Sequence, residues 1–267
     1  MKLYFFRGIR IIFLFLFISK FQQVYPFDEV RSADVRALSL GQIKALSRGI
    51  VNPAYLSFSE RKQIGVSVFN RFEMKELSTR SLFALLPNRW LDMNLRLSVF
   101  GYNEYQLIEG QAGFAKKLSS GFAIGTSVGY ITKNSILEER IQSYLLADLN
   151  FLWRINDVFE WALTTENLIH TRNSQPTFCF MGVKYQLAPT ASVLLESGYD
   201  FQNSFGISAG IEYEIVKELT VRGGFRNSLQ TPSLGFAVRI EHWNVDTVFL
   251  FHPTLGVSGG IAVEYLF

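Results

Sequence analysis

The stretch 255-LGVSGGIAVEYLF-267 ends the chain and decides the kind of fold. Its residues alternate between two classes. Counting back in steps of two from the last residue gives an apolar set apart from one glycine: Phe267, Tyr265, Val263, Ile261, Gly259, Val257 and Leu255. The positions between them are mostly small or polar. Since successive side chains of a β-strand point to opposite faces, this stretch is predicted to be a strand with one apolar face.

The apolar face of such a strand can pack in the core of a soluble sandwich or face lipid in an outer-membrane barrel. In a barrel the strand ends at an aromatic residue in the membrane interface, and here the last residue is Phe267. The final strand is similar to the C-terminal recognition strand of bacterial outer-membrane proteins. We therefore favour the barrel and expect the assembly signal at Ile261, Val263, Tyr265 and Phe267.

Further strand candidates follow one another from residue 63 onward, about fourteen in all, with twelve or sixteen left open as alternatives. Each has about 10 to 13 residues, the length that a tilted strand needs to cross the hydrocarbon layer. Alternation is clearest at 122–130, 205–215 and 234–241, where glycine and charge share one face. The sequence thus predicts an all-β fold, an antiparallel transmembrane β-barrel of about 14 strands over residues 62–267.

Every second connection between these strand candidates is tight. The tight connections are residues 87–90, 118–121, 155–157, 187–189, 216–218 and 242–243. They are expected to be periplasmic turns, with both chain ends on the same side. The remaining connections are short for external loops, which leaves the lumen, the wall or the rim as the working surface.

The N-terminal region predicts export and a plug. Lys2, Arg7 and Arg10 precede the apolar run 11–18, which is too short to span a bilayer as a helix, so residues 1–24 are predicted to be a secretory signal peptide. Residues 25–61 show neither strict alternation nor a helical stripe, and Gly41 and Gly49 favour turns. This short segment is expected either to cover the end of the barrel or to plug its lumen.

Composition excludes some partner classes. A net charge of +3, with basic residues scattered along the chain, argues against nucleic acid. The single cysteine, Cys179, cannot form an internal disulfide and is expected to act as a small hydrophobe.

No catalytic residue, metal site or cofactor is predicted. The histidines lie at strand ends or turns, with no spacing that places two of them on one face: His170, His242 and His252. Ser258 near His252 raises the alternative of a lipid hydrolase, but Ser258 falls on the inward face. Instead, acidic and arginine side chains are expected to form ion pairs in the lumen: Glu160, Glu166, Glu212, Glu214, Glu241 and Glu264 with Arg80, Arg96, Arg222 and Arg239.

Several stretches together resemble the PorV/PorQ group of Bacteroidota outer-membrane proteins, within the FadL-like barrel superfamily. The plug stretch ALSLGQIKALSRGIVNPAYLSF carries an Asn-Pro-Ala motif at Asn52, Pro53 and Ala54. WALTTENLI and the segment 246–251 are similar to two strands of the group. The turn HPTLGVSGGI is similar to its His-Pro-x-Leu-Gly turn, here His252, Pro253, Leu255 and Gly256. The sequence departs from the group at Gln42, Lys44 and Arg48, where the group is rich in glycine, alanine and acidic residues.

The resemblance implies a fourteen-stranded, plugged barrel in the outer membrane of a Gram-negative, Bacteroidota-type cell. It further implies a non-enzymatic role in type IX secretion, in which the barrel binds cargo or machinery components. The alternative is a FadL-like passive channel for hydrophobic small molecules, and a third hypothesis is a purely structural barrel. Outer-membrane lipid and the barrel-assembly machinery are the other expected partners. An apolar lumen around the plug would favour the channel, whereas a polar lumen with an exposed apolar rim would favour protein binding.

Overall fold

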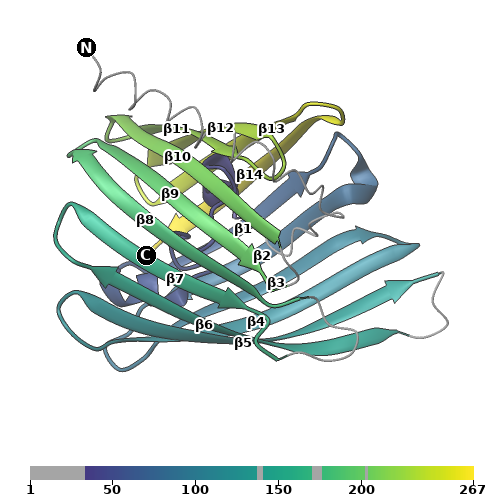
Figure 1. Cartoon of the computed structure of the whole chain (residues 1–267), viewed down its shortest axis with the longest axis horizontal. Coiled ribbons are helices and arrows are strands. Elements are labelled where there is room, and N and C mark those ends of the chain that lie inside the picture. Colours follow the sequence, from purple (N-terminus) through teal and green to yellow (C-terminus); the bar gives the residue numbers. More distant parts are fainter. Residues whose placement is uncertain (1–33, 137–140, 170–175, 202–203) are drawn as a thin grey trace, which may run out of the picture.

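The computed structural model is a closed barrel of antiparallel strands, inclined to the barrel axis (Figure 1). The structure describes residues 34–136, 141–169, 176–201 and 204–267; the predicted signal peptide and His170 lie outside these ranges. Each strand pairs with its neighbours in sequence, and β1 pairs with β14 to close the wall. The strands are β1 (Gln63–Asn70), β2 (Ser78–Leu86), β3 (Asp92–Tyr102), β4 (Tyr105–Lys117), β5 (Phe122–Ser135), β6 (Gln142–Arg154), β7 (Phe159–Glu166), β8 (Phe178–Ala188), β9 (Ala191–Asp200), β10 (Ser204–Val216), β11 (Leu219–Arg226), β12 (Thr231–Ile240), β13 (Trp243–His252) and β14 (Gly256–Leu266).

The predicted fold class is confirmed, including the fourteen strands. The two faces of the strands differ as the alternation requires. On β5, Ala123 and Ser127 are fully buried inside the barrel, whereas Val128 and Tyr130 are exposed on the outer wall. Exposed apolar side chains lie on the outward faces of the strands, among them Leu82, Leu97, Val128 and Leu145, as the exterior of a lipid-embedded barrel requires.

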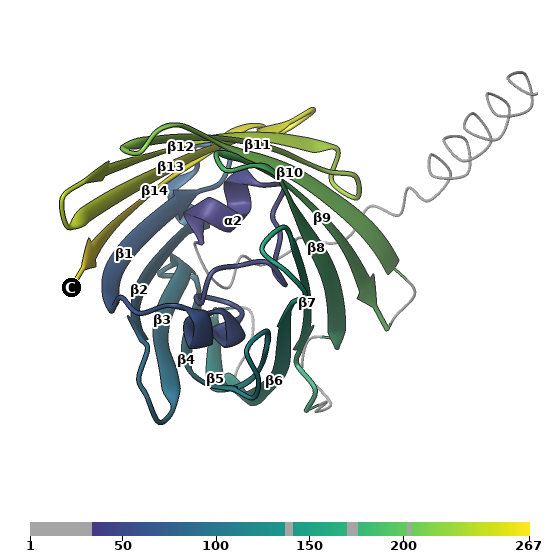
Figure 2. The same cartoon turned by 90° about the vertical axis from the view of Figure 1, so that its left-hand side faces the viewer.

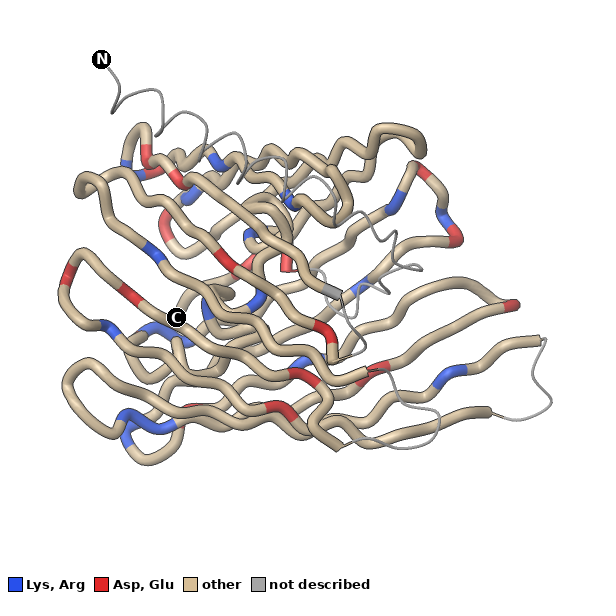
Figure 3. Tube along the Cα trace, in the orientation of Figure 1, with Lys and Arg blue, Asp and Glu red and all other residues tan. Residues whose placement is uncertain are grey.

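The tight connections lie at one end of the barrel, together with the start of β1 and the end of β14. We call this the periplasmic end and the opposite one the outer end, after the usual orientation of outer-membrane barrels. The opposite, outer end carries the connections that include the short 3-10 helix η2 (Lys75–Leu77). In Figure 3, residues of both charge signs are interspersed along the trace.

The segment before β1 fills part of the lumen. It contains the helix α2 (Val35–Ser39) and the 3-10 helix η1 (Pro53–Phe58), both enclosed by strands in the view along the barrel (Figure 2). The helix α2 packs on β11 to β14, and η1 packs on β3 to β6. We call residues 34–59 the plug. Of the two interpretations left open above, the structure shows the plug inside the lumen rather than an arm over the barrel end.

Two of the expected lumenal charges lie elsewhere. Arg80 shares the outward face of β2 with Leu82, so it cannot join a lumenal network. Glu241 lies in the turn between β12 and β13, where its φ is 52°, and is exposed. Arg80 keeps the alternation of β2, which places it on the outward face although it is charged, whereas Glu241 lies just after the last residue of β12.

Among the described residues, no helix has the length and apolar character needed to cross a membrane.

Candidate functional site

The plug is fastened to the wall at Glu212, which faces the lumen from β10. Arg36 of the plug binds this carboxylate with two nitrogens, Nε at 2.9 Å from Oε2 and Nη2 at 3.2 Å from Oε1. Arg48 of the plug donates to Oε1 at 2.7 Å, and Arg222 of β11 donates to Oε2 at 2.8 Å. Arg222 also pairs with Asp246 of β13. One carboxylate therefore joins two plug residues to two strands of the wall.

The pKa values of the two plug arginines, Arg36 and Arg48, are shifted by these surroundings. Burial would lower the pKa of Arg36, but the neighbouring Glu212 outweighs burial, so the pKa of Arg36 is raised and the guanidinium stays charged. The adjacent Arg36 lowers the pKa of Arg48. Glu212 is thus the anion that permits two cations to lie close together in the plug.

A second attachment lies at Glu196 on β9. Its carboxylate accepts hydrogen bonds from the backbone nitrogens of Lys44, at 2.8 and 2.9 Å, and of Ala45, at 2.7 Å. The Nζ atom of Lys44 donates to Glu166 of β7 at 2.8 Å and lies 4.8 Å from the centre of the Phe180 ring. This attachment fixes the backbone of the plug as well as its side chains.

The predicted plug motif is buried at the start of η1. The Asn52 side chain accepts from the backbone nitrogen of Ala54 at 3.0 Å and donates to the carbonyl of Ala45 at 2.8 Å. Pro53 occupies the first turn of η1, where its missing N–H costs nothing. A Cβ at Gly125 of β5 would come within 2.9 Å of the Pro53 ring. The motif therefore shapes the plug and seats it against β5.

The next residue of the plug, Tyr55, is buried and donates to Glu160 of β7 at 3.3 Å. Burial raises the pKa of Tyr55, and Glu160 raises it further, so the phenol remains neutral over the ordinary pH range.

Glycine on the wall allows close approach of the plug. A Cβ at Gly210 would lie 2.7 Å from the carbonyl oxygen of Leu40, and a Cβ at Gly224 would overlap the backbone of Leu40 and Gly41. Gly41 itself has a φ of 82°, which favours glycine. The small residues noted on the inward face of β10 thus make room for the plug.

The plug also has an apolar contact with the wall. Its buried apolar side chains pack on inward residues of β5 to β9: Leu40, Ile43, Ala45, Leu46, Ala54 and Tyr55 on Ala123, Leu152, Ala162, Phe180 and Leu194.

A second apolar cluster lies nearer the outer end, on the inward faces of β3 to β6. We call it the outer apolar cluster, and its buried members are Phe100, Leu107, Ile131, Tyr144 and Leu146. One step toward the periplasm on the same strands lies a polar layer, in which Arg96 pairs with Glu109 at 2.5 Å and Gln111 donates to Asp148 at 2.6 Å. From the outer end, the lumen at these strands is therefore apolar, then polar, then filled by η1.

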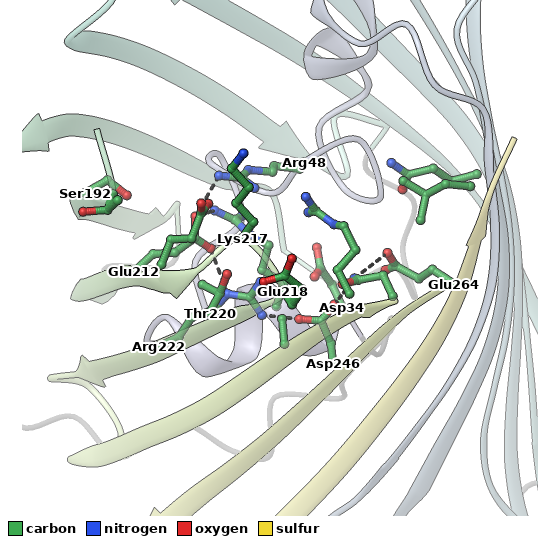
Figure 4. Close-up of a pocket in the computed structure, with 18 of the residues that line it drawn as sticks. Asp34, Arg48, Ser192, Glu212, Lys217, Glu218, Thr220, Arg222, Asp246 and Glu264 are labelled. Atoms are coloured by element: carbon green, nitrogen blue, oxygen red, sulfur yellow. Dashed lines mark hydrogen bonds and ion pairs between the residues drawn. The ribbon is translucent and has the colours of Figure 1, made fainter. Parts of the chain in front are cut away.

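On the periplasmic side of the plug lies a polar cavity of about 350 Å³, with the residues of the Glu212 network along its wall (Figure 4). Lys217 and Glu218, from the turn between β10 and β11, also line it. Glu264 of β14 accepts from Asn244 at 3.0 Å. Acidic and basic side chains both line the cavity, and the plug and the wall each contribute residues of both charge signs.

The other sequence-predicted residues lie apart from this site. The family-like turn is at the outer end, where the Nδ1 atom of His252 accepts from the backbone nitrogen of Leu255 at 3.1 Å, Pro253 follows in the turn, and Gly256 has a φ of 89°. At the periplasmic end, the ring of Tyr265 lies 4.9 Å from that of Trp243 and 5.0 Å from that of Phe267. Ile261 faces outward and is 47% exposed, and Val263 is half-buried.

Sequence reasoning placed Glu212 and Arg222 in the lumen but missed their partners in the plug. It also missed Glu196, and Asn94 of β3, which donates to the plug carbonyl of Gly49 at 2.6 Å. A signal was present in the departures from the family pattern: Lys44 and Arg48 are cations that bind carboxylates of the wall.

Comparison with solved structures identifies the barrel type. The toluene transporter TodX of Pseudomonas putida aligns with a TM-score of 0.67 and 10% identity, over 91% of this chain and 98% of that chain. A FadL homologue of Pseudomonas aeruginosa aligns with a TM-score of 0.61 and 9% identity, over 85% and 95%. The monoaromatic hydrocarbon channel CymD aligns with a TM-score of 0.64 and 10% identity, over 90% and 98%.

The chain has the FadL-type barrel fold. The similar structures include a toluene transporter and a monoaromatic hydrocarbon channel. No protein-family model matches the chain. No curated protein sequence matches it either.

Proposed function

We propose that the protein is a passive outer-membrane channel for hydrophobic small molecules, with the plug controlling passage. The observation that carries this proposal is the presence of buried apolar side chains in the lumen around and above the plug, in the outer apolar cluster and in the apolar contact between plug and wall. The fold supports it, because barrels of the same type include a toluene transporter and a monoaromatic hydrocarbon channel.

The proposed route begins at the outer apolar cluster. An apolar solute is transferred there from water with favourable free energy, displacing side chains such as Leu107 and Leu146. Further passage requires the plug to shift, since η1 packs against β3 to β6 below the polar layer. The attachments at Glu212 and Glu196 then set how readily the plug moves.

The type IX secretion role predicted from sequence rests on the motif resemblance alone, as does the assignment to Bacteroidota. The lumen has apolar clusters around the plug, which favour a channel, and a polar cavity on the periplasmic side of the plug. We therefore place the secretion role second. Binding of secretion components, of cargo and of the barrel-assembly machinery stays a prediction, which co-purification from gently solubilised membranes would test.

The channel proposal is tested by uptake of toluene and of oleate into proteoliposomes containing the purified barrel. We expect the wild-type barrel to admit both faster than empty liposomes do. In the Leu146→Asn variant an amide enters the outer apolar cluster, and because burying such a group costs about 1–3 kcal/mol, uptake should fall at least about fivefold.

The matched control is Leu145→Asn, the same substitution at the adjacent residue, which faces outward and is 51% exposed. Heat-modifiable migration on a gel confirms that each variant is folded. Equal uptake through the wild-type barrel and through empty liposomes would show that the channel proposal is wrong.

A further inference from the structure

One arginine lies on the outward face of the wall, where lipid would make a charged side chain costly. Arg80 lies on the outward face of β2, paired across the sheet with Val68 of β1 and Val99 of β3. The next outward residue of β2 toward the periplasm is Leu82, which is 47% exposed, and Leu97 beside it on β3 is 49% exposed. Arg80 therefore marks the outer edge of an apolar band.

The position of this edge fits the headgroup level of the membrane. An outward arginine costs about 2–4 kcal/mol at the bilayer midplane and about 0–1 kcal/mol near the interface. Arg80 is only two residues from Ser78, the first residue of β2 at the outer end. Long basic side chains in this position extend toward the lipid headgroups.

Arg80 lines a surface cleft of about 300 Å³ together with other polar side chains. Lys75 of η2, Tyr102 and Asn103 of the β3–β4 hairpin and Gln106 of β4 contribute further hydrogen-bonding groups. Within the part of the chain that the structure describes, no hydrogen bond or ion pair engages the guanidinium of Arg80 or the ammonium of Lys75. Glu76, the acidic residue of the cleft, forms no ion pair with either of them.

We propose that this cleft binds a phosphate group of a phosphorylated glycolipid in the outer leaflet, the chemistry of lipid A. The guanidinium of Arg80 offers two parallel donors to a phosphate, and Lys75 adds a point charge. A membrane-anchored phosphate fits better than a free one, because Arg80 and Val99 of the cleft are followed on the outward faces of β2 and β3 by the exposed Leu82 and Leu97, on which the acyl chains of a lipid could pack. The proposal depends on the outer-membrane location and is independent of the channel function.

The test measures binding of lipid A to the full-length folded barrel in detergent, by native mass spectrometry. Bisphosphorylated lipid A is compared with the same lipid from which both phosphates have been removed. We expect Arg80→Leu and Lys75→Gln each to weaken binding of the phosphorylated lipid by about fivefold. The dephosphorylated lipid should bind the wild-type barrel as weakly as the variants bind lipid A.

Lys62→Gln, just before β1 at the opposite end, removes one exposed charge and should leave binding unchanged. Arg80→Leu continues the apolar band, so it should still fold, as heat-modifiable migration would show. Unchanged binding in both cleft variants, or equal binding of the dephosphorylated lipid, would overturn the proposal. Inorganic phosphate binding as tightly as lipid A would overturn it as well, since the ligand would then be a free anion.

Discussion

At the scale of single residues, the placement of the plug depends on a few buried charges. Glu212 receives three guanidinium groups, two from the plug and one from the wall. Removing one charge from such a network leaves the others buried without a counter-ion, which destabilises more than an exposed ion pair stabilises. The plug is therefore expected to be more sensitive to Glu212 than to any exposed carboxylate of the barrel.

The Glu212→Gln substitution should release the plug while leaving the barrel folded. Loss of a buried, paired charge costs about 3–5 kcal/mol, and here that cost falls on the contact between plug and wall. Trypsin should then cleave the plug at Arg36, Lys44 or Arg48 in the folded barrel, whereas the wild-type plug resists. Asp157→Asn, in the exposed turn between β6 and β7, is the control and should cleave like the wild type. A plug that remains resistant in Glu212→Gln would show that the apolar contact suffices.

Tyr55 predicts a dependence on alkaline pH. Its pKa is raised in the folded state, so the folded barrel keeps the phenol proton that the unfolded chain releases above about pH 10. This contribution to stability is complete below the unfolded pKa and is lost as the pH rises above it. The thermal midpoint of Tyr55→Phe should therefore fall less steeply above about pH 10 than that of the wild type.

The control for this experiment is the comparison of Tyr55→Phe with the wild-type barrel below about pH 9, where the phenol of Tyr55 is protonated in the folded and the unfolded chain. There the difference between the two thermal midpoints should not change with pH. Identical slopes for Tyr55→Phe and the wild type above about pH 10 would contradict the assignment to Tyr55.

At the scale of elements, strand β11 shows how one strand serves two environments. Gly224 faces the plug, where a Cβ would overlap the backbone of Leu40 and Gly41. Its neighbour Gly223 faces outward, where a Cβ would meet its nearest atom, Cδ2 of Leu234, at 3.8 Å. The absence of a side chain is thus required on one face of β11 only.

Gly224→Ala should displace the α2 end of the plug, because the overlap is with backbone atoms that cannot rotate away. We expect trypsin to reach Arg36 and solute uptake to rise in this variant. Gly223→Ala, the matched control on the same strand, should behave as the wild type or slightly stabilise the strand. An undisturbed plug in Gly224→Ala would mean that β11 moves instead, which a shift in barrel stability would reveal.

At the scale of the whole molecule, closure depends on the pairing of β1 with β14. This pairing runs from Gln63 with Leu266 to Asn70 with Gly259, and the backbone nitrogen of Phe267 donates to the carbonyl of Lys62 at 2.9 Å. The first and last strands of the sequence are therefore neighbours in the wall, and their pairing closes the barrel. The aromatic rings of Trp243, Tyr265 and Phe267 gather at this seam on the periplasmic side.

Phe267→Ser should reduce the amount of assembled barrel in cells several-fold, with unfolded chain left in the periplasm. The reason is the predicted role of Ile261, Val263, Tyr265 and Phe267 as the assembly signal. The measurement is the heat-modifiable band in isolated outer membranes. Phe249→Ser, on the outward face of β13, makes the same change away from the terminus and should assemble more fully. Equal loss in both variants would indicate a general effect of lost apolar surface.

The sequence by itself determined the wall of this protein. Alternation with a period of two fixes which residues face lipid, and the turns at every second connection fix the order of the strands, so about fourteen strands and the plug could be predicted. These are local properties, carried by neighbouring residues. The prediction of the facing side failed at Glu241, which lies beyond the end of β12, and at Arg80, a charged residue on the outward face of β2.

Only the tertiary structure decided what the inside of the barrel does. Arg36 and Glu212 are 176 residues apart, and Lys44 and Glu166 are 122 residues apart, so no local pattern relates them. Their pairing follows from closure, which encloses the plug and brings its charges within reach of particular strands. The same closure collects Phe100, Ile131 and Leu146 into the outer apolar cluster. The order of the strands in the barrel follows their order in the sequence, whereas contacts across the lumen form only when β1 pairs with β14 and closes the barrel.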